Sequence, residues 1–222
     1  MSDIVQAHGN YQELESYQNS VVIFDGTNDF CRWYLKKGDR TIDQMIQAAR
    51  SGKQNIIEGC AASGISSETE IKLIGVARAS LEELLEDYRD YLRIHRLPLW
   101  SKDDPRIVQI RQLARTKNRT YETYKTCLPP NNAELFCNTM ISLIHQTSFL
   151  LDRQLKALAD KFTEKGGLQE RMYNARVKYR EAQSEKVLSL LRDIYREVAK
   201  YNDEHLLKKI EEAANLLKGG KQ

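Results

Sequence analysis

The chain has 222 residues, and its 34 lysines and arginines nearly balance 31 acidic residues, so the formal net charge is only +3. With four prolines and eleven glycines, the composition is typical of an all-helical protein of one domain and an extension, long enough to bury a core. No apolar run is long enough to span a bilayer, which excludes a transmembrane protein, and the charge is far below that of a dedicated nucleic-acid binder.

The charge is distributed unevenly along the chain. Residues 1–104 contain 12 Lys and Arg against 17 Asp and Glu, whereas the remaining residues contain 22 against 14. The first part therefore carries a charge of about −5 and the second about +8. A basic second half is compatible with a polyanionic partner.

The first predicted helix begins near Asn10, which has Glu13 at capping distance. Two lysines at 36 and 37 place positive charges at its carboxyl end, and Gly38 is free to adopt a positive φ. Its apolar residues recur at intervals of three and four: Leu14, Tyr17, Val21, Phe24, Cys31 and Leu35.

Residues 41–95 predict two helices joined by a turn, which together form a helical hairpin. Thr41 caps the first helix, and Ser67 with Glu70 has the spacing of a capping box at the start of the second. Water-facing helices usually carry Lys and Glu, but one face of the first helix is polar and uncharged. This face is either an ordinary solvated surface or an interface with another copy of the chain. Its residues are Gln44, Gln47, Ser51 and Asn55.

An inserted helix is predicted at about residues 105–128, with Pro105 at the position of its first residue. It is the most basic helix of the chain and has a single acidic residue after its start, Glu122. Arginines four residues apart share one side of a helix, so they can contact successive phosphates. The predicted nucleic-acid-binding residues are Arg111, Arg115, Lys117, Arg119 and Lys125.

Two tyrosines, Tyr121 and Tyr124, lie beside these basic residues. They allow two interpretations: stacking on nucleic-acid bases, or packing on the core side of an amphipathic helix. The second interpretation is favoured because both tyrosines continue the apolar side of the predicted helix.

The next predicted helix is capped by Asn131 or Asn132 and runs to about Phe162, and we assign it as the fourth helix of a bundle. Two glycines at 166 and 167 end the pattern, and no further Gly or Pro occurs until Gly219. The sequence therefore allows one final helix of roughly 50 residues, about 75 Å long. Coiled-coil pairing, folding back and fraying of its end are all compatible with the pattern.

The hairpin resembles bacterial four-helix-bundle proteins related to those encoded in 23S rRNA intervening sequences, a group that includes the accessory variability proteins of diversity-generating retroelements. The resemblance rests on Gln44, Ala48, Ala49, Ser51, Asn55, Ile56, Glu58 and Gly59, followed by Ala79, Ser80 and Glu83. A C-terminal suffix extension found on some members resembles His145, Gln146, Leu150, Leu151, Asp152 and Gln154, then Gly166, Gly167, Glu170, Arg171 and Met172. Where these proteins commonly have Ser-Ile-Pro, this chain has Ser51, Gly52 and Lys53, so a proline kink is not expected.

The resemblance implies a homo-oligomer with a positively charged surface, and a pentameric ring is one assembly that it suggests. The members that are better understood form ring-like oligomers of this kind. These properties are expectations from the resemblance and not from composition or spacing.

No catalytic or metal-binding motif is found in the sequence. None of the four histidines has a Glu three residues before it, which argues against a di-iron centre, and His145 is expected to make a hydrogen bond at the flank of its helix. The chain has four cysteines, Cys31, Cys60, Cys127 and Cys137. They form no C-x-x-C pair, and we interpret them as free thiols. Because the first residues do not resemble a signal peptide, we expect a cytoplasmic protein without cofactor, metal or small-molecule substrate.

These observations predict an all-α fold, an antiparallel up-and-down four-helix bundle at residues 1–165 with one inserted helix, followed by a long helical extension at residues 166–222. The expected function is non-enzymatic: a homo-oligomer that binds structured RNA, or DNA, through a basic surface, with no membrane partner. The alternative is a protein interaction scaffold that uses the long C-terminal helix.

Overall fold

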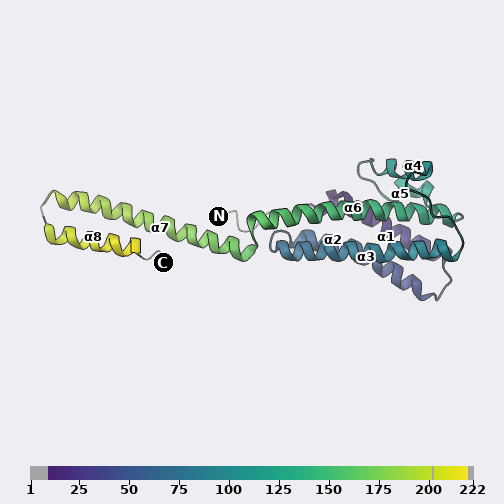
Figure 1. Cartoon of the computed structure of the whole chain (residues 1–222), viewed down its shortest axis with the longest axis horizontal. Helices are drawn as coiled ribbons and strands as arrows, with labels where there is room; N and C mark the ends of the chain where they lie inside the picture. Colours follow the sequence, from purple (N-terminus) through teal and green to yellow (C-terminus); the bar gives the residue numbers. More distant parts are fainter. Residues whose placement is uncertain (1–9, 202, 220–222) are drawn as a thin grey trace. The chain divides into compact units, whose positions relative to one another are not determined.

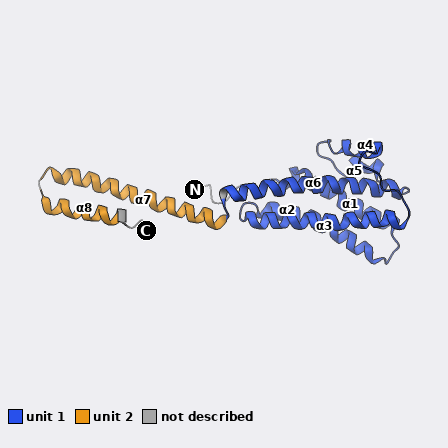
Figure 2. Cartoon of the chain, in the orientation of Figure 1, with its two compact units in different colours: residues 1–167 blue, residues 168–222 orange. Residues whose placement is uncertain are grey.

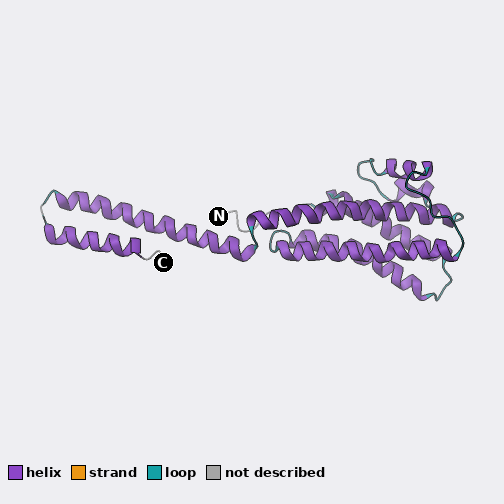
Figure 3. Cartoon of the chain, in the orientation of Figure 1, coloured by secondary structure: helices purple, strands orange, loops and turns teal. Residues whose placement is uncertain are grey.

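The computed structural model describes residues 10–201 and 203–219, and every regular element in these ranges is a helix (Figure 3). The predicted all-α class is thereby confirmed. Contacts between residues within the chain divide it into two compact units, residues 1–167 and residues 168–222 (Figure 2). Within the described ranges, no helix combines the length and the apolar character that crossing a membrane requires.

Four long helices of the first unit surround a common hydrophobic core (Figure 1). Helix α1 packs against α2 and α6, and α3 packs against the same two helices. A short 3-10 helix with Asn10 as its N-cap precedes α1. The bounds are Tyr11–Glu13 for η1, Glu15–Tyr34 for α1, Arg40–Ala62 for α2, Ser67–Ile94 for α3 and Ala133–Lys165 for α6.

The starts of α2, α3 and α6 are fixed by side-chain oxygens that accept backbone N–H groups. Asn132 Oδ1 accepts the N–H of the third residue of α6 at 2.9 Å, which confirms this predicted cap. Two other predicted caps are wrong, because Asp39 rather than Thr41 caps α2, and Ser66 rather than Ser67 caps α3. The residues that do cap these helices already have extended φ and ψ angles, so the helix begins immediately after them.

Glu70, which was expected to complete a capping box, is instead buried with 7 % exposure. The shift of the cap to Ser66 makes Thr69 the third helical residue, and its Oγ1 donates to Ser66 Oγ at 3.0 Å. Burial raises the pKa of the Glu70 carboxyl group. The capping box is therefore replaced by a hydroxyl pair, and the glutamate belongs to the wall of the core.

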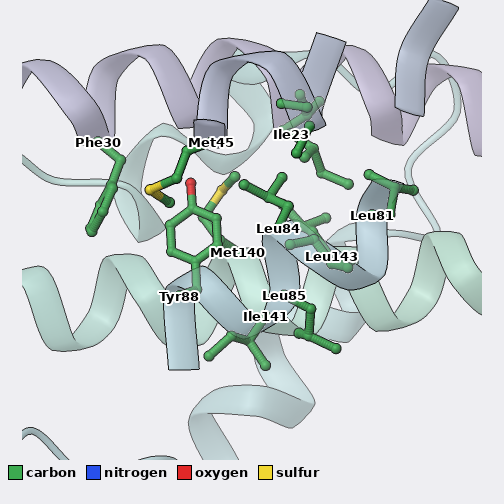
Figure 4. Close-up of a cluster of buried hydrophobic side chains, with 14 of the residues drawn as sticks. Ile23, Phe30, Met45, Leu81, Leu84, Leu85, Tyr88, Met140, Ile141 and Leu143 are labelled. Carbon is green, nitrogen blue, oxygen red and sulfur yellow. The ribbon is translucent and has the colours of Figure 1, made fainter. Parts of the chain in front are cut away.

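The centre of the core is occupied by Tyr88, which has no exposed surface (Figure 4). Thr27 Oγ1 donates its single proton to the carbonyl oxygen of Ile23 at 2.7 Å, so the Tyr88 hydroxyl donates to Thr27 Oγ1 at 3.1 Å. Met45 from α2 and Met140 from α6 lie beside the tyrosine ring. The hydroxyl group at the centre of this apolar core is therefore satisfied internally.

Helices α2 and α3 approach each other closely because two glycines of α2 face α3. A Cβ atom on Gly52 would lie 2.9 Å from Leu81 Cδ2, and one on Gly59 would lie 3.1 Å from Ile74 Cδ1. The later glycine of α2 meets the earlier residue of α3, and the earlier glycine meets the later residue, so these two helices run antiparallel. The predicted helical hairpin is confirmed.

The prediction of a single inserted helix at residues 105–128 is wrong. The first helix of this segment ends at Leu113, Asn118 then has a positive φ of 53°, and the N–H of Thr120 donates to Thr123 Oγ1 at 3.1 Å to start a new turn. Helix α4 lies along α6 (Figure 1). The segment consists of α4, Pro105–Leu113, α5, Tyr121–Tyr124, and η2, Lys125–Cys127.

The second unit contains two helices, α7, Leu168–Ala199, and α8, Glu204–Gly219, which pack against each other. The sequence allowed one unbroken helix here, but the chain turns back after α7. Asp203 Oδ1 accepts the N–H of Leu206 at 3.0 Å and so caps α8. Of the three expected arrangements, the described residues adopt the folded-back one.

The close contact between α2 and α3 gives a stability prediction with a matched control. Gly52→Ala should lower the free energy of unfolding by about 1–3 kcal/mol, because the added methyl group overpacks the contact with Leu81. The control is Gly75→Ala in α3, where nothing lies within 4 Å of an added Cβ. That variant should gain about 0.5–1 kcal/mol from higher helix propensity. Urea denaturation measures both, and equal effects would contradict the close approach.

Candidate nucleic-acid interface

The segment between α3 and α6 carries a net positive charge. Residues 102–119, the basic segment, contain six Lys and Arg and two Asp. Ile107 and Ile110 of α4 are buried, with 5 % and 2 % exposure, where α4 packs on α6. Because the apolar side of α4 is covered, its charged side chains face solvent.

Three of the five predicted nucleic-acid-binding residues, Arg111, Arg115 and Lys117, are exposed. None of the three forms an ion pair with any residue in the described part of the chain. Lys125 is also exposed, but its Nζ atom lies 3.0 Å from a carboxylate oxygen of Glu122. The structure therefore leaves three predicted cations exposed and without an ion pair to a described residue.

Arg119 does not lie on this surface, and the predicted stripe of three arginines is wrong. Its side chain is 3 % exposed, Nε donates to Asn19 Oδ1 at 2.7 Å, and Nη2 lies 3.3 Å from Glu15 Oε2. Nη1 donates to the carbonyl oxygen of Ala114 just after α4. Because the helix ends before residue 119, the arginine turns inward and caps the carbonyl groups that α4 leaves free.

The two tyrosines beside the basic segment face the protein interior. Tyr124 has no exposed surface, and the Tyr121 hydroxyl donates to Asp29 Oδ2 at 2.7 Å. Burial and the bond to this carboxylate raise the pKa of the Tyr121 hydroxyl. The favoured interpretation, packing on the core side, is confirmed, and neither tyrosine offers a ring for base stacking.

Trp100 is an aromatic residue near this surface that the sequence did not indicate. The guanidinium of Arg106 lies 3.5 Å from the centroid of its ring. Trp100 Nε1 donates to Glu134 Oε1 at 2.6 Å, and Arg106 also pairs with Asp104 at 2.8 Å. Arg106 is therefore neutralised by carboxylates and held on the indole, unlike the three cations without an ion pair to a described residue.

A groove beside α4 brings together basic groups from three helices, and we call it the cationic groove. Arg89 from α3, Arg111 from α4 and His145 from α6 line it, with Lys102 at its edge, and its volume is about 210 Å³. Arg89 Nη2 lies 3.3 Å from His145 Nε2, so His145 makes the hydrogen bond expected of it. Burial, Arg89 and Arg111 together lower the pKa of His145, although Glu82 opposes them.

The role of Arg89 could not be predicted from the sequence because its partner His145 is distant in the chain. The two residues are 56 positions apart, and the charged residues of the helix that carries Arg89 are typical of a solvent-exposed face. The only available signal was negative: His145 lies off the apolar stripe of α6 and so has to meet another helix or solvent.

The polar face predicted as an oligomer interface borders an open groove between α2 and α3, the acidic groove, of about 880 Å³. Its walls include Gln44 and Gln47, both exposed, together with Asp43, Glu83 and Asp87. Burial and the neighbouring Asp90 and Glu83 raise the pKa of the Asp87 carboxyl group. This surface is therefore acidic where the α2 sequence alone indicated a neutral face.

The other two predicted interface residues, Ser51 and Asn55, are half-buried and bonded within the chain. Ser51 Oγ lies 2.8 Å from Ser80 Oγ across the hairpin, and Asn55 Nδ2 donates to the Ser51 carbonyl at 2.9 Å. The Ser51 bond joins α2 to α3 and the Asn55 bond lies within α2, which leaves Gln44 and Gln47 as the exposed part of the set.

The described residues hold no cluster of three or more His, Cys, Asp or Glu side chains arranged for a metal ion. All four cysteines are free, and burial raises the pKa of the thiols of Cys31, Cys60 and Cys137. Thiols held in the protonated form are poor nucleophiles. The basic side chains of the cationic groove and the basic segment can interact electrostatically with an anion.

No known family model, curated protein or solved structure matches this chain.

The buried position of Arg119 predicts that its substitution affects stability. Arg119→Gln leaves the Asn19 amide oxygen and the free carbonyl of Ala114 without their donor, so the free energy of unfolding should fall by about 1–3 kcal/mol. The matched control, Arg115→Gln, removes the same charge from an exposed site and should change it by less than about 0.5 kcal/mol. If chemical denaturation gave equal midpoints for the two variants, Arg119 would not have its buried role.

Proposed function

We propose that this protein is a non-enzymatic, self-associating helical bundle that binds structured RNA or another nucleic acid through the basic segment. The observation that supports the proposal most directly is that Arg111, Arg115 and Lys117 of the basic segment are exposed and form no ion pair with a described residue. Exposed cations without carboxylate partners keep their full charge for phosphates, and their counterions are released on binding.

We further propose that α1, α2, α3 and α6 form the antiparallel up-and-down four-helix bundle of the intervening-sequence and accessory variability proteins. Two observations support this arrangement. Each helix packs against two of the others in a closed cycle, and short connections join α1 to α2 and α2 to α3. The resemblance in residues of the α2–α3 hairpin supports the same assignment and suggests a nucleic-acid partner.

Recognition in this proposal is electrostatic and depends on the shape of the ligand. Tyr121 and Tyr124 are turned inward, so base stacking does not contribute there. Structured RNA is commonly recognised through its phosphates and its helical shape. We therefore expect strong dependence on salt and little dependence on base sequence.

Replacing Arg111, Arg115 and Lys117 together by Gln tests the nucleic-acid interface. The variant should bind a structured RNA more weakly, and the slope of log K against log salt should become flatter by about 2–3 units. Fluorescence anisotropy over a salt series measures both quantities. Arg119 is left intact, so that the variant keeps the fold.

The control variant replaces three other residues by Gln: Lys36, Lys37 and Arg40. These are also exposed and basic but lie at the α1–α2 connection. It removes the same net charge and should keep most of the affinity and the slope. If both triple variants lost affinity equally, binding would follow net charge alone, and the basic segment would not be the interface.

We propose that self-association uses the acidic groove. An isologous contact through this groove would bring Asp43, Glu83 and Asp87 of two copies together, which like-charge repulsion disfavours. A heterologous contact, with a basic surface of the next copy against the groove, avoids this repulsion. Heterologous contacts that close produce rings, which is the type of assembly that the resemblance suggests.

Gln44→Lys with Gln47→Lys tests this interface, because the added cations would repel a basic partner surface. Light scattering should show a mass that falls toward the 25.7 kDa monomer. Gln12→Lys with Gln112→Lys, two exposed positions outside the groove, serves as the control and should keep the assembly. A wild-type protein that is already monomeric would contradict self-association.

A second candidate function is a protein interaction scaffold, and one feature of the α7–α8 unit favours it. No residue of α7 is buried in the described unit. Val187, Leu190 and Ile194 are 40 %, 55 % and 49 % exposed and share one face of α7 at helical spacing. A preparation free of nucleic acid that retained a defined protein partner through α7 would favour this function over the first.

A further inference from the structure

Three groups that can carry positive charge converge in the cationic groove from separate helices. Arg89 Nη2 and His145 Nε2 are 3.3 Å apart, and the Arg111 side chain lines the same groove from α4. Arg111 also donates through Nη1 to the carbonyl oxygen of Lys102 at 3.1 Å, which holds its side chain along the groove. This convergence requires α4 to be docked on α6, and no single helix creates it.

The hydrogen bond between Arg89 and His145 defines the proton state of the imidazole. A guanidinium only donates, so His145 Nε2 accepts from Arg89 and is unprotonated in this arrangement. Protonation of Nε2 would break this bond and bring a third positive charge beside Arg89 and Arg111. In that state three positive charges would lie together, which is the situation that a bound anion relieves.

Two carboxylates oppose the positive groups from the same side of α3. Glu86 Oε1 accepts from Arg89 Nη1 at 2.6 Å, and Glu82 acts on His145 from one turn earlier. The ion pair between Glu86 and Arg89 is exposed and joins residues three apart on one helix, so it contributes little to the free energy of folding. It occupies Nη1 of Arg89 and leaves Nη2 directed at His145.

We infer that the cationic groove is a binding site for one phosphate group, held by Arg89, Arg111 and a protonated His145. The inference rests on the proposed function in one respect, since a backbone phosphate of the bound nucleic acid is one source of this group. Inorganic phosphate is the other source. None of the three residues is needed for the core, because all line an open groove on the surface.

The dimensions and walls of the groove suit such a ligand. A volume of about 210 Å³ holds several waters of about 30 Å³ each, or a tetrahedral anion with part of its hydration shell. Trp100, Ile107 and Ile141 form apolar walls, which limit water and strengthen charge-assisted hydrogen bonds inside. Arginine forks match phosphate oxygens bidentately, whereas a carboxylate would satisfy fewer of the donors.

Binding should be coupled to the protonation of His145. Its pKa is lowered in the free protein by burial, Arg89 and Arg111, against the opposing Glu82. A bound anion stabilises the imidazolium, so the pKa of His145 rises on binding and a proton is taken up. Affinity should therefore increase as the pH falls from neutral through the lowered pKa, and sulfate, which keeps its charge over this range, reports the effect without titrating itself.

The experiment is an NMR titration of the full-length protein labelled at histidine Cε1, with His145→Gln used to assign the resonance. Sulfate and inorganic phosphate are added at constant ionic strength maintained with chloride, and a short RNA is added in a separate arm. His95, which stacks on Tyr91 away from the groove, is the internal reference. We expect a saturable shift of the His145 resonance and an upward shift of its pKa, with no saturable change at His95.

The variants separate the site from general charge effects. Arg111→Gln and Arg89→Gln should each weaken sulfate binding by about tenfold or more, as expected for the loss of a charge-assisted hydrogen bond. Arg93→Gln is the matched control, because Arg93 lies on α3 with an ion pair to Asp90 three residues earlier and outside the groove. Glu86→Gln should tighten binding, since it frees Arg89.

The outcomes distinguish this site from the proposed function. A saturable His145 response to sulfate and phosphate, lost in Arg111→Gln, supports the site, and a matching response to RNA assigns the phosphate to nucleic acid. The same response to phosphate without any RNA binding supports a site for free phosphate and contradicts the proposed function. A shift that follows ionic strength alone, equal at His145 and His95, overturns the site even if the RNA binds elsewhere.

Discussion

The buried guanidinium of Arg119 determines how the segment between α3 and α6 is placed. A cation with 3 % exposure has to be compensated, and here an amide oxygen, a carbonyl oxygen and the Glu15 carboxylate share this task. One side chain thereby ties the end of α4 to the first helix of the unit. Helix α4 itself ends at Leu113 and packs on α6.

The placement of α4 has consequences for the charge of the surface. It brings Arg111 next to two groups on neighbouring helices, Arg89 and His145, and leaves Arg115 and Lys117 exposed, without an ion pair to any described residue. The acidic groove between α2 and α3 carries the opposite charge. The first unit therefore presents a basic surface and a separate acidic surface, which suits an assembly with unlike contacts and a polyanionic ligand.

Helical periodicity predicted the parts of the structure that depend on local spacing. The all-α class, the α2–α3 hairpin and the start of α6 at Asn132 follow from apolar spacing, glycines and capping residues. The prediction of one inserted helix was wrong because its arginines fit a helical stripe equally well, whereas α4 ends at Leu113 and Arg119 turns inward to Asn19. The Arg89–His145 pair was missed for a related reason, since it joins two helices whose relative rotation the sequence does not specify.

An anomalous diffraction measurement on crystals of the full-length protein grown with selenate tests the phosphate site most directly. Selenate has the tetrahedral shape and charge of sulfate and gives a strong anomalous signal. Our structure predicts a selenium peak in the cationic groove within hydrogen-bond distance of Arg89, Arg111 and His145 in the wild type, and none in Arg111→Gln. An empty groove in the wild type, or a peak that persists in the Arg111→Gln variant, would contradict the site.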